Sequence, residues 1–294
     1  MGHDHAEHRR DVPLRRLIPN VITTAALCCG LASLHFSVRE EWNLAILAIL
    51  FSAIFDALDG RAARLLRVTS KFGEVLDSLS DFLSFGVAPA MLIYKWLLAA
   101  DPTPNVGRAA PDDVLRLAAV TTFALCSAMR LARFTSATTE AATAAKENPK
   151  LGNYFTGMPT PAAAGAVLIP VMVETSKHTH WRPPEWLAIA LAFLIAFLMV
   201  SRVAMFSFKK LRVAKGWVAP ILILVGLTVV CMVKDLWLTL AGLAGLYLLS
   251  LPLSVMMHRR VVVADRGGTP TGSGGNGSDL TGRADAADGA AGVR

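Results

Sequence analysis

Long apolar runs are the feature that most constrains how this chain can fold. A helix that crosses a membrane needs about 20 mostly apolar residues, because each residue adds 1.5 Å and the hydrocarbon core is about 30 Å thick. The sequence holds eight candidate segments, which run over residues 17–38, 42–64, 74–99, 114–135, 159–175, 184–203, 216–233 and 236–257. It therefore predicts an all-α, polytopic membrane helix bundle with about eight transmembrane helices.

Composition agrees with a chain that lies in lipid. Hydrophobic residues make up 54% of the 294 residues and charged residues 17%, whereas soluble domains carry about 25% charged residues. The two ends are more polar than the middle. We expect a polar cytoplasmic tail over 1–16, a membrane domain over 17–215, an additional transmembrane helix pair over 216–257 and a disordered cytoplasmic tail over 258–294.

Basic residues are unevenly divided between the two predicted membrane faces. With the N-terminus inside, the outer face holds seven of the 29 Lys and Arg residues: Arg39, Lys95, Arg108, Arg116, Lys177, Arg182 and Lys234. The remaining 22 of 29 face inward, as the positive-inside rule requires. We expect an integral protein of a bacterial-type inner or cell membrane with both termini on the cytoplasmic side. The net charge of +7 then faces anionic lipids, and no recognition module indicates a nucleic-acid partner.

Four aspartates interrupt the apolar pattern of the second and third segments. Asp56 and Asp59 are three residues apart, and Asp77 and Asp81 are four apart. Each pair therefore shares one face of its helix. The short basic stretch between the segments predicts an antiparallel hairpin that brings the two pairs together at the cytoplasmic end.

Bare carboxylates near lipid are costly, so something positive must neutralise this group. One possibility is an ion-pair network with the nearby arginines and lysine. The other is one or two divalent cations, and an all-oxygen ligand set suits Mg²⁺, Mn²⁺ or Ca²⁺. Gly60 and Gly73 favour the metal, because each removes a side chain where a ligand or a facing helix comes close.

The pattern D-x2-D-G-x2-A-R-x8-G-x3-D-x3-D resembles the signature of the CDP-alcohol phosphatidyltransferases. All eight positions are present: Asp56, Asp59, Gly60, Ala63, Arg64, Gly73, Asp77 and Asp81. The resemblance implies two metals, Mg²⁺ or Mn²⁺, held by the four aspartates, with Asp81 also acting as the general base. It further implies that Gly60, Ala63, Arg64 and Gly73 line the CDP site. Two metals suit an in-line attack at phosphorus, which needs both the attacking and the leaving oxygen stabilised.

The first segment carries a shorter match to the same family. Pro19, Asn20 and Thr23 fit its P-N-x-x-T start, and the resemblance implies that Asn20 and Thr23 lie near the nucleotide. An alternative is that Pro19 and Asn20 simply begin the helix, with Asn20 as its N-cap. Both interpretations stay open at this point.

Later motifs are more particular to one branch of the family. The segments RLARF, FTGMPTPAAAG and LMVSRVAMFSFKKLR resemble the phosphatidylserine synthase branch, and the resemblance covers about residues 14–215. It implies CDP-diacylglycerol as donor, L-serine as acceptor, and membrane lipids around a homodimer. Arg130 and Arg133 are candidates to hold the serine carboxylate or a lipid phosphate, or they anchor the inner face. Gly157 belongs to a turn that forms the mouth of the acceptor pocket or starts a helix.

Two further hypotheses remain. The same chemistry can serve another acceptor, such as glycerol 3-phosphate, inositol phosphate or a phosphatidylglycerol. A protein of another class, an ion-coupled transporter, can use the aspartates as an ion relay. The glycine and alanine positions of the signature argue against the transporter, because a relay does not require them.

Overall fold

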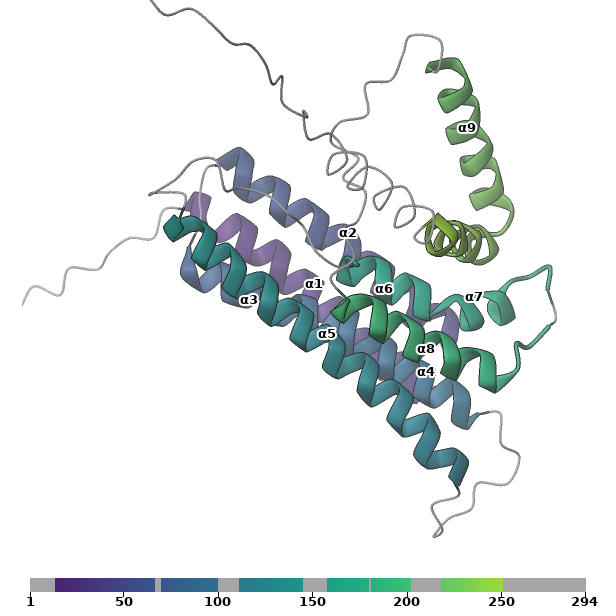
Figure 1. Ribbon diagram of the computed structural model, residues 1–294. Helices are drawn as coiled ribbons and strands as arrows, with labels where there is room; N and C mark the ends of the chain where they lie inside the picture. The colour runs from purple at the N-terminus through teal and green to yellow at the C-terminus, as the bar shows by residue number, and fades with distance from the viewer. Residues whose placement is uncertain are drawn as a thin grey trace, which may run out of the picture.

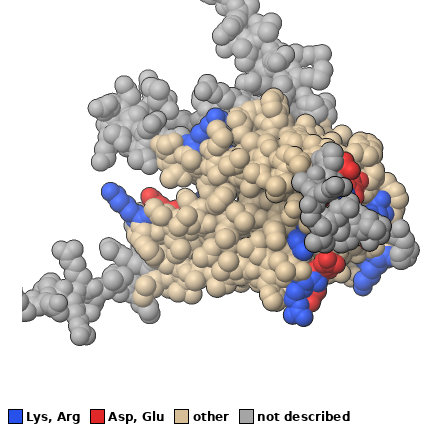
Figure 2. Space-filling view, turned by 90° about the horizontal axis from the view of Figure 1, so that it is seen from below, with Lys and Arg blue, Asp and Glu red and all other residues tan. Residues whose placement is uncertain are grey.

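A computed structural model describes residues 14–66, 70–99, 111–144, 158–179, 181–201 and 218–250. Within these ranges every regular element is a helix, which confirms the all-α prediction. Large apolar side chains on the surface fit a lipid surrounding, since Phe197 is 72% exposed and Val233 84% exposed. In Figure 2 most of the visible face is apolar or uncharged, and the charged side chains gather toward its edges.

Four helical rods form the first half of the bundle (Figure 1). These rods are α1 (Leu14–Val38), α2 (Trp42–Leu66), the continuous run of α3 (Lys71–Phe82), η1 (Leu83–Val87) and α4 (Ala88–Leu98), and α5 (Pro111–Ala144). Each is long and apolar enough to cross a membrane. The protein is therefore a membrane protein with four candidate spans among the described residues.

Shorter helices form the second half: α6 (Thr160–Val167), α7 (Ile169–Thr175), α8 (Glu185–Val200), α9 (Val218–Lys234) and an unlabelled helix, Leu236–Ser250. The segment 159–175, predicted as one helix, is two short helices. Pro170 supplies the reason, because it cannot donate a hydrogen bond in the first turn of α7. The total of about eight spans stays a prediction.

The position at which α1 begins contradicts one of the two interpretations of the first segment, namely that Asn20 is the N-cap. The helix begins at Leu14, so Pro19 lies inside it and Asn20 is not its N-cap. Proline removes one backbone donor, the one that would bond to the carbonyl of Arg15, and the helix continues through that single loss. The N-cap interpretation of Asn20 is therefore wrong, and its side chain is available for another purpose.

A π-helical turn, η1, lies in the middle of the third rod, shortly after Asp81. Pro89 follows one turn later and cannot donate to the carbonyl of Phe85, and the wider turn relieves that conflict. Both α1 and α5 approach η1 closely here. A Cβ on Gly30 of α1 would lie 2.4 Å from Ser84 Oγ, and a Cβ on Gly86 would lie 2.9 Å from Ser127 Oγ of α5. These contacts hold the third rod against α1 and α5 just after Asp81.

Candidate active site

The hairpin brings the two aspartate pairs together, as the spacing predicts. Carboxylate oxygens of Asp56, Asp59 and Asp77 all lie within 4.8 Å of one another. Asp81 lies next to Asp56, and it stands beside this trio rather than within it. Helices α2 and α3 pack mainly against α1 and only slightly against each other. The aspartates therefore come together from two helices that both pack against α1.

The ion-pair alternative finds no support in the described part of the chain. None of the salt bridges in that part includes any of the four aspartates. Arg64, the nearest arginine of the signature, turns back on its own helix and donates from Nε to the Gly60 carbonyl at 2.8 Å. Arg67 lies outside the described residues. A cluster of close carboxylate oxygens without a cationic partner is a donor set that fits a hard divalent cation.

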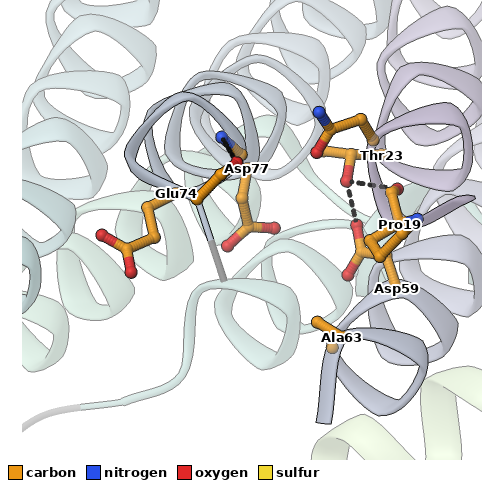
Figure 3. Close-up of a pocket in the computed structure, with 10 residues that line it drawn as sticks. Pro19, Thr23, Asp59, Ala63, Glu74 and Asp77 are labelled. Carbon is orange, nitrogen blue, oxygen red and sulfur yellow. Dashed lines mark hydrogen bonds between the residues drawn. The ribbon is translucent and has the colours of Figure 1, made fainter. Parts of the chain in front are cut away.

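A pocket of about 120 Å³ opens beside this cluster (Figure 3). Its lining residues come from α1, α2 and α3: Pro19, Asn20, Thr23, Asp59, Gly60, Ala63, Ser70, Gly73, Glu74 and Asp77. Asp59 and Asp77 approach from opposite walls (Figure 3). Five of the six residues predicted for the CDP site are in this lining, namely Asn20, Thr23, Gly60, Ala63 and Gly73. The sixth, Arg64, directly follows Ala63 and is exposed.

Thr23 reaches the cluster through a hydrogen bond. Its hydroxyl donates to Asp59 Oδ2 at 2.7 Å, and its oxygen lies 3.0 Å from the Pro19 carbonyl. Both Thr23 and Asp59 are buried. Thr23 therefore orients a carboxylate of the cluster, which is a role that the motif alone did not distinguish from contact with the nucleotide.

The two signature glycines serve different ends. A Cβ on Gly73 would lie 2.9 Å from Asn20 Oδ1 and 3.1 Å from Ser70 Oγ, so this glycine lets α3 approach α1. A Cβ on Gly60 would meet nothing within 4 Å, although Gly60 lines the pocket. Packing within the described protein therefore does not explain Gly60.

Sequence reasoning missed Ser70 and Glu74. Ser70 is the N-cap of α3, where its hydroxyl accepts from the Gly73 amide at 3.0 Å. Glu74 lies in the first turn of α3 and at the pocket wall. A signal was present for both: a serine directly before the helix is a capping pattern, and Glu74 shares a helix face with Asp77, three residues on.

The arginines proposed for the acceptor pocket have separate partners. Arg130 Nη1 donates to Thr160 Oγ1 at the start of α6, and Arg130 interacts electrostatically with Asp81. Arg133 Nη1 instead donates to the Val200 carbonyl at the end of α8, at 3.1 Å. Gly157 lies outside the described residues. Of the three, Arg130 is the one that the structure brings near the aspartates.

Two family models match the chain. Residues 16–207 match the model described as CDP-alcohol phosphatidyltransferase, and residues 216–252 match the one described as CDP-alcohol phosphatidyltransferase 2. The second match covers the last two predicted helices, for which inspection of the sequence found no motif.

Three curated relatives carry the name CDP-diacylglycerol–serine O-phosphatidyltransferase. The protein of Mycobacterium leprae is 29% identical over 251 residues, which is 85% of this chain and 78% of the relative. That of Helicobacter pylori strain 26695 is 33% identical over 196 residues, 67% of this chain and 74% of the relative. That of Bacillus subtilis strain 168 is 32% identical over 193 residues, 66% of this chain and 92% of the relative.

Proposed function

This chain belongs to the CDP-alcohol phosphatidyltransferase family, whose members are phosphotransferases, and from that premise we propose that it transfers the phosphatidyl group of CDP-diacylglycerol to L-serine. The products are phosphatidylserine and CMP. The observation that carries the proposal is the family match over residues 16–207, which spans the carboxylate cluster and its pocket. The serine acceptor is supported by the names of the relatives.

In this proposal the aspartates divide the work. Asp56, Asp59 and Asp77 hold divalent cations, Mg²⁺ or Mn²⁺, and Asp81 completes the ligand set. When bound, two such cations neutralise the pyrophosphate of the donor and stabilise the attacking and leaving oxygens. The donor set fits this assignment, because three carboxylates converge within 4.8 Å and none of them forms a salt bridge among the described residues.

The proposed reaction needs one proton acceptor. A serine hydroxyl is a weak nucleophile until its proton is removed. Asp81 stands at the edge of the trio, next to Asp56, and in the proposal its carboxylate takes that proton. The serine oxygen then forms a bond to the phosphorus of the phosphatidyl group, and the bond between this phosphorus and the CMP oxygen breaks. The nucleotide lies in the pocket of Asn20, Thr23, Gly60, Ala63 and Gly73, and Arg64 at its edge contacts phosphate.

The orientation in the membrane follows from the distribution of basic residues. We propose that the active site and both termini face the cytoplasm, where serine and the CDP-lipid headgroup are available. A homodimer remains part of the proposal by resemblance to the family. Cysteine labelling at engineered loop positions on either side of the bundle tests the orientation, since only outer positions react with an impermeant reagent in intact cells.

The decisive experiment is an acceptor assay with the purified full-length protein. The protein, CDP-diacylglycerol and labelled L-serine are incubated after chelation, with and without added Mg²⁺ or Mn²⁺. We expect metal-dependent phosphatidylserine and an equal amount of CMP. Metal-dependent CMP release with glycerol 3-phosphate or inositol phosphate, but not with serine, would support phosphatidyl transfer and show that serine is not the acceptor. Full activity after exhaustive chelation would overturn the metal assignment.

A further inference from the structure

The helix Leu236–Ser250 lies against the bundle outside the catalytic signature. Its side chains line a cavity of about 300 Å³ together with α2 and α6, through Leu240, Leu243, Ala244 and Tyr247. Near its start, Trp237 Nε1 donates to Asn43 Oδ1 at the beginning of α2, at 2.7 Å. Tyr247 follows ten residues later, or about 15 Å along the helix axis. The helix therefore carries Tyr247 from the distal end of α2 toward the end that holds the aspartates.

Arg130 on α5 connects Tyr247 with the aspartate cluster. The guanidinium interacts electrostatically with both Asp81 and Tyr247. Within the described residues no salt bridge of 4.0 Å or less joins Arg130 to Asp81. The arginine thus stands near the proposed base without forming a salt bridge to it.

Arg130 also has donor capacity that the described protein does not use. A guanidinium carries five N–H donors, and Arg130 donates from one of its nitrogens, Nη1, to Thr160 Oγ1. Arg130 Nε is buried and has no hydrogen-bond partner among the described residues. A buried donor of this kind calls for an acceptor, and the fork of an arginine matches the two oxygens of a carboxylate.

We infer that Tyr247 is an acceptor-specificity residue, whose hydroxyl joins the Arg130 guanidinium in holding the carboxylate of the amino-acid acceptor. The acceptor hydroxyl then points to Asp81, on the other side of Arg130. This inference rests on the proposed function, because it gives the serine acceptor a binding site. It also gives the C-terminal segment, which matches a second family model over residues 216–252, a part in the active site.

The test is a kinetic comparison of the full-length wild type with Tyr247→Phe, which removes only the hydroxyl. We expect the KM for L-serine to rise about tenfold, as for the loss of one hydrogen bond to a charged group. The KM for CDP-diacylglycerol and the kcat at saturating serine stay within about twofold. Serinol, which has the serine hydroxyl but no carboxylate, is a poor substrate whose rate is the same in both proteins. Tyr94→Phe, a matched change on α4, leaves all of these values unchanged.

Two results would overturn the inference while the proposed function stands. One is an unchanged serine KM in Tyr247→Phe, and the other is an equal rise in the KM of serine and of CDP-diacylglycerol, which marks a structural loss. Arg130→Lys provides a second variant, in which we expect a raised KM for serine. In the double variant with Tyr247→Phe, the combined effect on the free energy of serine binding should be smaller than the sum of the two single effects. A wild type that makes no phosphatidylserine overturns the proposed function itself. The activity of the wild type is therefore measured before any variant is compared.

Discussion

The two ends of the bundle treat their carboxylates in opposite ways. At the end assigned to the outer face, Glu185 accepts from buried Arg116 at 2.7 Å. Glu174 accepts from Trp96 Nε1 at 2.5 Å and lies 3.5 Å from Arg182 Nη1. Each of these acids has its counter-charge or donor built into the chain, so they hold α4, α5, α7 and α8 together without any ligand.

The acids at the other end are arranged differently. Asp56, Asp59, Asp77 and Asp81 face one another, and the described residues offer them a neutral hydroxyl, from Thr23, but no salt bridge. Charges that are held away from water need compensation. The comparison teaches that acidic residues within a membrane protein do not by themselves indicate a site. The informative feature is a set of converging acids that no salt bridge in the described chain compensates.

The largest effect that tests this comparison is expected from Asp81→Asn. The variant keeps the size of the side chain and removes the carboxylate that takes the serine proton. We expect phosphatidylserine formation to fall on the order of 10²–10⁴-fold, the range for loss of a general base. The rate is measured in detergent with saturating substrates and metal.

The matched control lies at the opposite end of the bundle. Glu185→Gln removes an acid from the ion pair with Arg116, so we expect a lower melting temperature with activity within about twofold of the wild type. The comparison breaks if Glu185→Gln also abolishes turnover while the protein remains folded. It breaks equally if Asp81→Asn keeps wild-type activity.

A smaller effect is expected from Gly60→Ala. The added methyl group meets no protein atom within 4 Å, and alanine favours a helix by about 1 kcal/mol over glycine. Stability should therefore be unchanged or higher, while the methyl group intrudes on the pocket. We expect the KM for CDP-diacylglycerol to rise about tenfold, or about 1.4 kcal/mol.

Gly226→Ala is the appropriate control, because a Cβ at this position on α9 also meets nothing within 4 Å and Gly226 does not line the pocket beside the aspartates. It should change neither KM nor kcat. An unaltered KM in Gly60→Ala would mean that the open space at Gly60 is not where the donor binds.

Much of this site could be predicted from the sequence, because helical periodicity is local. The intervals from Asp56 to Asp59 and from Asp77 to Asp81 place each pair on one face before any tertiary contact is known. A short connection between the helices then brings the pairs together. Gly60 and Gly73 were singled out by their lack of a side chain and by the family signature, and only the structure separates close helix packing at Gly73 from open space at Gly60.

Other features depend on tertiary structure and were not predictable in this way. The side chain of Arg64 turns to its own backbone, a choice of rotamer that spacing does not determine. The approach of Tyr247 to Arg130 joins residues more than 100 positions apart. The early start of α1 was also missed, because a proline near a helix end is compatible with both the first turn and the interior.

The smallest effect is expected from a change at Asp235, which lies at the end of the bundle assigned to the outer face. Asp235 is 7% exposed and precedes the Leu236–Ser250 helix. It accepts from Ser176 Oγ at 2.5 Å and from the Leu238 amide at 3.1 Å, and its Oδ2 lies 3.0 Å from His178 Nδ1. Burial alone would raise the pKa of Asp235, but these hydrogen bonds and His178 hold the pKa well below its usual value.

Asp235→Asn should therefore lower stability at neutral pH by about 1–2 kcal/mol, as for weakened hydrogen bonds to a charged group, with little effect on kcat. Because the pKa is depressed in the folded state, this contribution is present above the unfolded value of about 4 and is lost as the pH falls below it. The melting temperatures of wild type and variant should thus differ at pH 7 and converge in acid. A difference that persists unchanged below pH 4 would show that the aspartate stabilises the turn through shape rather than charge. The helix that Asp235 caps also carries Tyr247. A rise in the KM for serine in this variant would therefore mean that the contacts of Asp235 also help to position Tyr247.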